Sequence, residues 1–299
     1  MTDFWTKDIQ HFFTQKILSC ELLGSGCSND AYLIQTNDAK KYVAKRARNA
    51  PEHKAQNTLF LEAKLLEFLS PKHLCIFIPK IVFLSENPDM YGYEYIPGML
   101  LTKIWEEIHP LVKISISKQL WQFHAELGKN ISRKESWKLW LNIDLSPDLH
   151  PESLEDLRKI HGDPDIPGDI KHLALSMRKV LENTFSDLHF QFLHNDAHHE
   201  NILVADAEIT GFIDFWEAEY GEITKEFSRY IRDFPDYWQY IVQSYEEHSW
   251  NMLSCERLIS YSFLAGLIDN IEMWKKWGEK RDQANKNIMW YKNALKNIS

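Results

Sequence analysis

The densest group of reactive side chains lies in 194-HNDAHHEN-201, which holds three histidines, an aspartate, a glutamate and two asparagines. Two apolar runs follow, 201-NILV-204 and 209-ITGFIDF-215, with a polar turn between them. Such a hairpin brings Asn201 and Asp214 to the same end, opposite the turn. A carboxylate and an amide oxygen at one point suit a hard cation such as Mg²⁺, which keeps several waters and shares its remaining positions with phosphate oxygens.

A further carboxylate, that of Asp196, lies in the loop that leads into this hairpin. It is placed to accept the proton of a hydroxyl nucleophile. The alternative is a zinc site, because imidazoles beside an aspartate bind zinc. A zinc site would leave Asn201, Asp214 and Lys45 without an explanation. We therefore expect His194 to anchor the loop through hydrogen bonds.

The amino-terminal part of the chain holds groups suited to binding phosphates. Gly24-Ser25-Gly26 lies between extended runs, where backbone N–H groups can approach phosphate oxygens, although two glycines also simply permit a hairpin. Lys45 alternates with apolar neighbours, so its cation points into a cleft or at a partner. Glu62 on the following helix is the natural partner, whereas Glu67 on the same helix reads as an ordinary solvated glutamate. A phosphate cover, a lysine, a metal pair and a base are the parts of phosphoryl transfer.

A β-rich first part and a helical second part are expected to position these residues. Extended runs are expected around Leu22 and at residues 32–35, 41–47, 78–86 and 90–96. Helices are expected at residues 5–19, 57–69, 102–130, 170–186, 224–249 and 252–277, with a small β segment at 192–215. The pattern predicts an α+β protein of two lobes, with a small antiparallel sheet in the first. Pro97-Gly98 ends the β-rich block, so we expect lobes at residues 1–97 and 98–299.

Composition limits the partners of this chain of 299 residues. Its net charge of −9 argues against binding nucleic acid or anionic lipid, which require clustered lysine and arginine. The four cysteines form no Cys-x-x-Cys pair, and the apolar runs are too short to cross a bilayer. The first residues show no basic segment followed by an apolar run. We expect a cytoplasmic protein with a small-molecule partner and contact with neither nucleic acid nor membrane.

Taken in order, the motifs resemble those of the aminoglycoside phosphotransferase and choline kinase family, which has a protein-kinase-like fold. The matching segments are 24-GSGCSNDAYLI-34, 43-VAK-45, Glu62, 93-YEYIPG-98, 194-HNDAHHEN-201 and 211-GFIDFWEAEYGE-222. The resemblance spans residues 20–232. The loop His-x-Asp-x-His-x-x-Asn followed by Ile-Asp-Phe is specific, whereas the glycine turn alone is weak. The resemblance implies a bilobal kinase-like fold with nucleotide bound between the lobes.

The resemblance also implies roles for the polar residues. Asp196 would be the catalytic base that orients and deprotonates the acceptor hydroxyl. Asn201 and Asp214 would hold Mg²⁺, and Lys45, fixed by Glu62, would bind the α- and β-phosphates.

Further positions in the family pattern contact the nucleotide through their backbone. The phosphate cover would comprise Gly24, Ser25, Gly26 and Ser28. Residues 94–96, with Glu94 and Ile96 at their ends, would form the hinge that reads the adenine. Since a hinge reads the base mostly through its backbone, ATP is expected and GTP is not excluded. His198 would orient the catalytic loop.

Several positions depart from the family pattern. Asn195 replaces a glycine before the base, although asparagine tolerates left-handed backbone angles better than most residues. His199-Glu200 replaces Pro-Gly before the metal asparagine. In 221-GEITKEFSR-229, Glu222 and Glu226 replace both aspartates of a later motif and its proline is lost. No glycine follows Asp214-Phe215, which favours the small-molecule branch over protein kinases.

The acceptor is expected between Asp196 and the helical part, where acidic residues are frequent. These are Glu217, Glu219, Glu222, Glu226, Asp233, Asp236, Asp269 and Glu272. Carboxylates suit an aminoglycoside or amino sugar, and the aromatic residues Trp216, Tyr220 and Trp274 suit a choline-like cation. A merely solvated acidic face is the structural alternative. The sequence thus predicts an ATP-dependent O-phosphotransferase for a small cationic acceptor, with a choline-like kinase, a protein kinase or a pseudokinase as alternatives.

Overall fold

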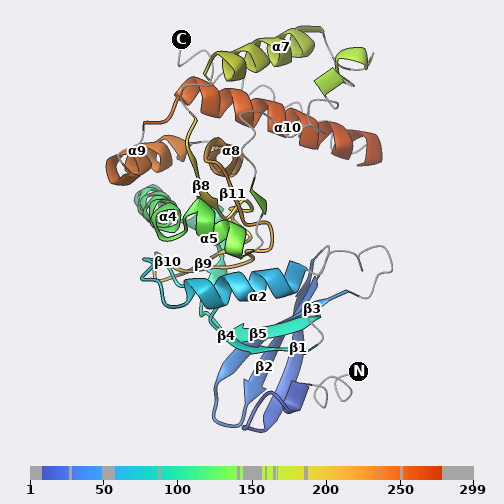
Figure 1. Ribbon diagram of the computed structural model, residues 1–299, viewed down its shortest axis with the longest axis vertical. Coiled ribbons are helices and arrows are strands. Elements are labelled where there is room, and N and C mark those ends of the chain that lie inside the picture. The colour runs from blue at the N-terminus through green and yellow to red at the C-terminus, as the bar shows by residue number, and fades with distance from the viewer. Residues whose placement is uncertain are drawn as a thin grey trace.

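A computed structural model describes residues 9–26, 29–48, 58–86, 89–139, 142–143, 157–158, 160–163, 166, 168–184, 188–234, 236–249 and 252–277. It shows an antiparallel sheet at one end of the molecule and a larger, mostly helical part at the other (Figure 1). A small β hairpin lies between the two parts. The α+β class with a kinase-like arrangement of two lobes is therefore confirmed.

The amino-terminal sheet has five antiparallel strands in the order β1-β2-β3-β5-β4. They are β1 (Ile17–Ser25), β2 (Asn29–Thr36), β3 (Lys41–Ala47), β4 (Ile81–Leu84) and β5 (Met90–Glu94). Helix α2 (Thr58–Leu69) packs beside the sheet (Figure 1). Its apolar stripe, Leu59, Ala63, Leu66 and Leu69, is buried as its helical spacing predicts.

The chain entering the sheet differs from the helix expected at residues 5–19. Of its described residues, only 9–10 are helical, and β1 already begins at Ile17. The Gln10 side chain closes a turn by accepting a hydrogen bond from Ile17 N at 3.0 Å. Phe12 stacks on Phe83 of β4 with ring centroids 4.3 Å apart. Packing of these aromatic residues on the sheet outweighs the local helical pattern.

The connection between the two parts passes through Gly98 into strand β6 (Met99–Leu100). Strand β6 pairs with β9 (Ile202–Ala205), and β9 pairs with β10 (Glu208–Phe212). The predicted hairpin thus forms, with its turn at residues 206–207. Gly98 has a φ of +150°, and a Cβ there would lie 2.6 Å from Thr210 Oγ1. Only glycine fits this crossover without strain.

The carboxy-terminal part is mainly helical. Its elements are α3 (Leu101–Ile104), η2 (Trp105–Glu107), α4 (Pro110–Asn130), α5 (Arg133–Lys138), α7 (Gly168–Asn183), α8 (Thr224–Asp233), α9 (Trp238–Ser249) and α10 (Cys255–Trp277). The single helix expected at 102–130 is interrupted before Pro110, which lacks an N–H and begins α4 instead. The helix expected at 224–249 is interrupted at Phe234, next to Pro235.

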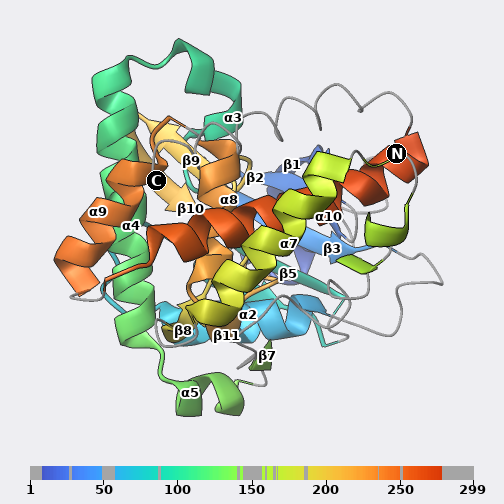
Figure 2. The ribbon, with the colours of Figure 1, turned by 90° about the horizontal axis from the view of Figure 1, so that it is seen from above.

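Two short strands were not expected from the sequence, namely β7 (Asn142–Ile143) and β11 (Glu219–Glu222), and a third, β8 (Phe190–Leu193), overlaps the expected β segment only at residues 192–193. They form a small sheet in the order β7-β11-β8. Helix α10 crosses α8, and α7 lies along α10 on the side away from the hairpin (Figure 2). Trp121 of α4 packs against Phe227 of α8 and Tyr245 of α9, so these helices share one core. None of the helices in the described ranges is long and apolar enough to cross a membrane.

Candidate active site

Lys45, Glu62 and Asp214 form one group of charges between the sheet and the hairpin. Lys45 Nζ lies 3.1 and 3.0 Å from the two Glu62 carboxylate oxygens, and 2.6 Å from Asp214 Oδ1. Glu62 also accepts a hydrogen bond from Phe215 N at 2.9 Å. The residue on α2 that the sequence pairs with Lys45 is therefore Glu62. Glu67 instead forms an exposed ion pair with Lys64 at 2.7 Å.

Because Lys45 is buried, its attraction to the two carboxylates of this group is strong. Burial by itself lowers the pKa of the Lys45 ammonium, but the carboxylates of Glu62 and Asp214 outweigh it and raise the pKa above its ordinary value. The lysine therefore stays charged although its side chain is largely buried. A fixed cation in such surroundings is suited to binding phosphate oxygens.

The Asp196 carboxylate is held by residues of its own loop. Asn201 Nδ2 donates to Asp196 Oδ2 at 2.9 Å and to the Asp196 carbonyl at 2.8 Å. His198 Nδ1 accepts a hydrogen bond from Glu200 N at 3.2 Å, and its Nε2 lies 3.3 Å from Asn201 Nδ2. This Nε2 lies 3.4 Å from Asp196 Oδ2. The geometry thus places His198 beside the carboxylate of the proposed base.

His194 joins the Asp196 loop to the strand that leads to Asp214. Its Nε2–H donates to the Ile213 carbonyl at 3.0 Å, and its Nδ1 accepts from Asp196 N at 3.3 Å. Burial lowers the pKa of His194 to about 3, so the ring remains neutral. Both nitrogens are engaged by the backbone, which supports the expected anchoring role and leaves neither for a zinc ion.

Glu226, which the sequence analysis placed among the acidic residues near the acceptor, instead supports the loop from behind. Glu226 of α8 accepts a hydrogen bond from Asn195 N at 3.0 Å. Asn195 itself has a left-handed φ of 62°, the conformation that the sequence departure at this position requires. Burial raises the pKa of Glu226 to about 7, against the lowering effect of the backbone hydrogen bonds. The side chain of Glu226 is one methylene longer than that of the aspartate in the family pattern, and with this length it reaches the loop.

Arg229, which the sequence analysis did not single out, contacts Asp196 and joins it to Glu217, one of the acidic residues expected near the acceptor. Arg229 Nη1 lies 3.2 Å from Asp196 Oδ1, and Arg229 Nη2 lies 3.4 Å from Glu217 Oε2. Burial, followed by the charge of Asp196, raises the pKa of Glu217 to about 7 in spite of Arg229. Arg229 and Glu226 are three residues apart on α8, so they share a helix face, and this spacing is the sequence signal that could have found Arg229.

The donor set at the hairpin fits a magnesium ion. Because Asn201 Nδ2 faces two oxygens of Asp196, the amide oxygen Oδ1 faces the other way. The amide N–H of Ile213 donates to the Asn201 carbonyl at 3.0 Å, which brings the neighbouring Asp214 close to Asn201. Asp214 uses Oδ1 for Lys45 and keeps Oδ2, and its side chain is 34% exposed. One carboxylate and one amide oxygen are the hard ligands that Mg²⁺ shares with phosphates.

The predicted phosphate cover lies at the turn between β1 and β2. Gly24 and Ser25 end β1, and Gly26 N donates to the Asn29 carbonyl at 2.8 Å to close the turn into β2. A Cβ on Gly24 would meet no atom within 4 Å, so the space around it is open. Ser28 lies outside the described residues.

The predicted hinge leads from the sheet toward the hairpin. Glu94 ends β5, and its side chain lies 3.7 Å from Lys80 Nζ. Ile96 is buried, and its Cγ2 lies 2.6 Å from where a Cβ on Gly211 of β10 would be. The close approach at Gly211 fixes this segment against the hairpin.

Several acidic residues considered for the acceptor are enclosed in the protein. Glu219 lies 2.9 Å from Lys225, Glu222 lies 3.5 Å from Arg257, and Glu226 faces the catalytic loop. All three are buried, so the expectation that they face an acceptor or solvent does not hold. The described side chains of Glu217, Asp236 and Trp216 are at least partly exposed. The side chains of Asp233, Asp269, Glu272 and Trp274 lie outside the described residues.

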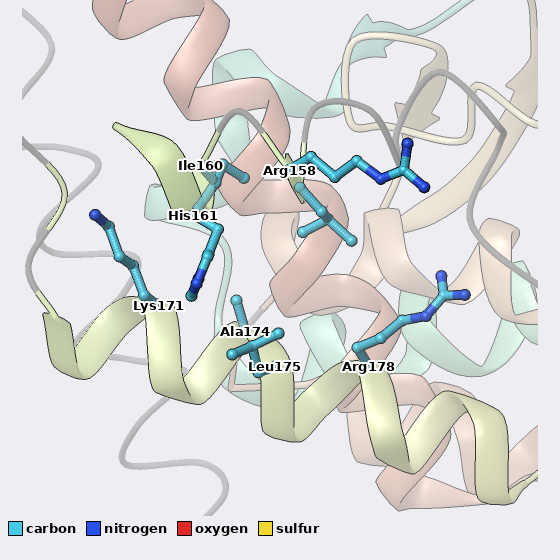
Figure 3. A pocket seen from close by; sticks show the side chains of 8 residues that line it. Arg158, Ile160, His161, Lys171, Ala174, Leu175 and Arg178 are labelled. Atoms are coloured by element: carbon cyan, nitrogen blue, oxygen red, sulfur yellow. The ribbon is translucent and has the colours of Figure 1, made fainter. Parts of the chain in front are cut away.

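A cavity of about 420 Å³ opens in a different part of the molecule, between the segment at Ile160 and helix α7 (Figure 3). Apolar side chains form its floor and basic ones its rim. They include Ile160, Ala174, Leu175, Arg158, Lys171 and Arg178. Helix α7 lies beyond α10 from the hairpin, so this cavity is separate from the charges around Lys45 and Asp196 (Figure 1).

Comparison with known proteins places this geometry in context. The model of a family described as "Phosphotransferase enzyme family" matches residues 19–251. No curated protein sequence matches the chain.

Solved structures share the fold over nearly the whole chain. The GDP and kanamycin complex of APH(2")-IIia has a TM-score of 0.70 and 17% identity, covering 98% of this chain and 99% of that one. Macrolide 2'-phosphotransferase MphH from Brachybacterium faecium, as apoenzyme, has a TM-score of 0.72 and 15% identity, covering 96% and 97%. The streptomycin-ATP ternary complex of APH(2")-IIa has a TM-score of 0.64 and 19% identity, covering 89% of both chains.

Proposed function

The chain belongs to the phosphotransferase enzyme family, and we propose that it transfers the γ-phosphoryl group of ATP to a hydroxyl of a small molecule. One observation carries this proposal. Side chains far apart in the sequence meet in one connected set, in which Lys45 contacts Asp214 and Asn201 contacts Asp196. The link between the two pairs is the hydrogen bond from Ile213 N to the Asn201 carbonyl.

Each member of the set has a task in the proposed reaction. Asp196 accepts a hydrogen bond from the acceptor hydroxyl, which orients it and later takes its proton. Lys45, held by Glu62, binds the α- and β-phosphates. Asn201 and Asp214 hold Mg²⁺, which supplies positive charge to the triphosphate when bound.

The two parts of the fold divide the work in this proposal. Residues 1–97 form a nucleotide-binding lobe, in which Gly24, Ser25, Gly26 and Ser28 cover the phosphates and residues 94–96 read the base. Residues 98–299 form the catalytic and acceptor-binding lobe. The strained glycine at position 98 supports this boundary, since β6 immediately beyond it pairs with the hairpin of the second lobe.

The acceptor in this proposal is a small cation such as an aminoglycoside or amino sugar. The support is chemical: Glu217 and the half-exposed Trp216 lie within three residues of Asp214, and the chain carries a net charge of −9. Similar folds occur in the proteins solved with kanamycin, gentamicin and streptomycin. A choline-like alcohol would use the same carboxylate and indole.

A panel of hydroxyl acceptors tests the proposal directly. Purified protein is incubated with MgATP or MgGTP and with aminoglycosides, macrolides, choline, amino sugars and a peptide pool, and products are identified by mass spectrometry. We expect one small-molecule class to gain a phosphoryl group, with loss of product in Asp196→Asn. Tight binding of MgATP without product from any acceptor would show a pseudokinase, and phosphorylated peptide alone would show a protein kinase.

A further inference from the structure

Arg229 of α8 places a cation against the carboxylate of the proposed base. Its guanidinium spans two carboxylates, with Nη1 3.2 Å from Asp196 Oδ1 and Nη2 3.4 Å from Glu217 Oε2. The Asp196 side chain is 13% exposed and that of Arg229 is 32% exposed. The pair is therefore mostly enclosed by protein, where a charge-assisted contact is stronger than on an open surface.

The two oxygens of Asp196 have different surroundings. Oδ2 accepts from Asn201 Nδ2 at 2.9 Å and faces His198 Nε2 at 3.4 Å. Asn201 Nδ2 therefore occupies one lone pair of Oδ2, and the His198 ring beside it leaves little room for a further donor at this oxygen. Oδ1 faces Arg229 and keeps a second lone pair. An acceptor hydroxyl that binds Asp196 must therefore approach Oδ1, beside the guanidinium.

We propose that Arg229 is a positioning residue for phosphoryl transfer, fixed on its other side by Glu217; this rests on the function proposed above. Arg229 holds the Asp196 carboxylate so that the free lone pair of Oδ1 points at the acceptor hydroxyl. As the hydroxyl oxygen bonds to the γ-phosphorus, the bond from phosphorus to the β–γ bridging oxygen breaks and ADP leaves with its electron pair. The hydroxyl proton passes to Asp196 Oδ1, and Arg229 stays protonated throughout.

The orientation of Asp196 would otherwise depend on contacts to one oxygen only. If only Asn201 and His198 contacted the carboxylate, both at Oδ2, the carboxylate could rotate about that oxygen. The guanidinium provides a second contact, at Oδ1. Its planar arrangement of N–H groups lets one side chain bind Asp196 and Glu217 at the same time. Loss of Arg229 should thus reduce the fraction of productive geometry, and so kcat, without changing how the nucleotide binds.

The test compares Arg229→Ala and Arg229→Lys with wild-type protein, using the best acceptor of the panel and also water as the acceptor in MgATP hydrolysis. We expect Arg229→Ala to lower kcat about tenfold to a hundredfold and to leave the KM for MgATP within about twofold. Lysine, or free guanidinium added to the alanine variant at non-denaturing concentration, should restore part of kcat. Glu217→Gln should give a smaller loss of kcat.

Controls separate a positioning role from a purely structural one. Arg178→Ala breaks a comparable arginine–glutamate contact of 3.0 Å on the distant helix α7 and should leave kcat unchanged. A kcat of Arg229→Ala within about twofold of wild type would overturn the inference. So would a loss that neither lysine nor guanidinium reduces and that accompanies a lower melting temperature. If wild-type turnover does not depend on Asp196, the proposed function itself fails and the inference falls with it.

Discussion

Lys45 Nζ lies 2.6 Å from Asp214 Oδ1, although the two residues are 169 positions apart in the chain. The contact joins the third strand of the sheet to the end of the hairpin. Glu62 binds the same ammonium and also the backbone of Phe215, the residue after Asp214. Three segments thus meet on one buried cation. The stability of the fold and the charge of the site depend on the same atoms.

The first prediction concerns the stability of this ion pair. Lys45→Met leaves the Glu62 carboxylate, whose side chain is fully buried, without its cation. Breaking a buried pair from one side costs about 3–5 kcal/mol of the free energy of unfolding. Lys45→Met/Glu62→Gln removes the orphaned charge and should recover a large part of that loss. Chemical denaturation of the three proteins measures both effects.

The exposed pair of Lys64 and Glu67 on the same helix provides the matched control. Its side chains are 43% exposed, so Lys64→Met should change the free energy of unfolding by only about 0–1 kcal/mol. Calorimetric titration with MgATP should show weak binding for Lys45→Met and for the double variant, because both lack the phosphate cation. Equal stability of Lys45→Met and wild type would contradict the burial of this pair.

A second prediction isolates the proposed base. Asp196→Asn keeps the shape of the side chain but offers no carboxylate to the acceptor proton. We expect phosphoryl transfer to fall by about 10² to 10⁴, with little change in affinity for MgATP. Asp206→Asn, in the exposed turn between β9 and β10, should retain full activity. The rate at which phosphorylated product forms is the measurement. If Asp196→Asn forms product at close to the wild-type rate, Asp196 is not the base.

Much of this site could be predicted because local patterns determine it. The alternation around Lys45 fixes which face of the strand it occupies, and the apolar stripe of α2 turns Glu62 toward the same interior. The hairpin brings Asn201 near Asp214 because strand length and turn position set the register. These features need only a few residues of sequence on either side.

Other parts depend on packing that the sequence does not display. Whether Glu226 faces solvent is decided by the rotation of α8 against α10 and the loop, whereas Glu222 ends β11 and is covered where Arg257 of α10 contacts it; the structure buries both. Arg229 was missed for the same reason. The short strands of the β7-β11-β8 sheet have two to four residues each, too few for a period-2 pattern to be recognised. The interruption at Pro110, in contrast, was readable from proline chemistry.

The crossover glycine gives a third prediction. Gly98 has a φ of +150°, and a Cβ there would meet Thr210 Oγ1 at 2.6 Å and Val204 N at 3.2 Å. Gly98→Ala should lower the free energy of unfolding by about 1–3 kcal/mol. Gly24→Ala, where the Cβ meets open space, should be neutral in stability. Thermal unfolding followed by circular dichroism compares the two variants.

The same pair of variants also tests the glycine turn. If backbone atoms at Gly24 approach the phosphates, Gly24→Ala should weaken MgATP binding while its melting temperature stays at the wild-type value. Gly98→Ala should show the reverse, a lower melting temperature with an affinity for MgATP close to that of wild type. Unchanged nucleotide affinity in a stable Gly24→Ala protein would remove this residue from the phosphate cover.

The last prediction concerns pH and the buried carboxyl of Glu226. Burial raises its pKa in the folded protein from an ordinary 4.5 to about 7, against hydrogen bonds from Asn195 N and His194 N and the charge of Arg229. His124 lies 3.9 Å away, but burial lowers its pKa to about 3, so it supplies no compensating cation. Between about pH 4.5 and pH 7 the folded state therefore binds more protons than the unfolded state.

The sign follows from that difference in bound protons. The contribution of Glu226 to stability is fully present below its unfolded pKa, and it is lost as the pH rises through its folded pKa near 7. Glu226→Gln keeps an acceptor for Asn195 N but cannot ionise. It should match wild type at about pH 4.5 and exceed it by up to about 3 kcal/mol above pH 7. Glu208→Gln at the exposed start of β10 is the control. Chemical denaturation from about pH 4.5 to above pH 7 measures the difference in the free energy of unfolding between Glu226→Gln and wild type. A difference that does not vary with pH would mean that Glu226 in the folded protein is ionised across the whole range.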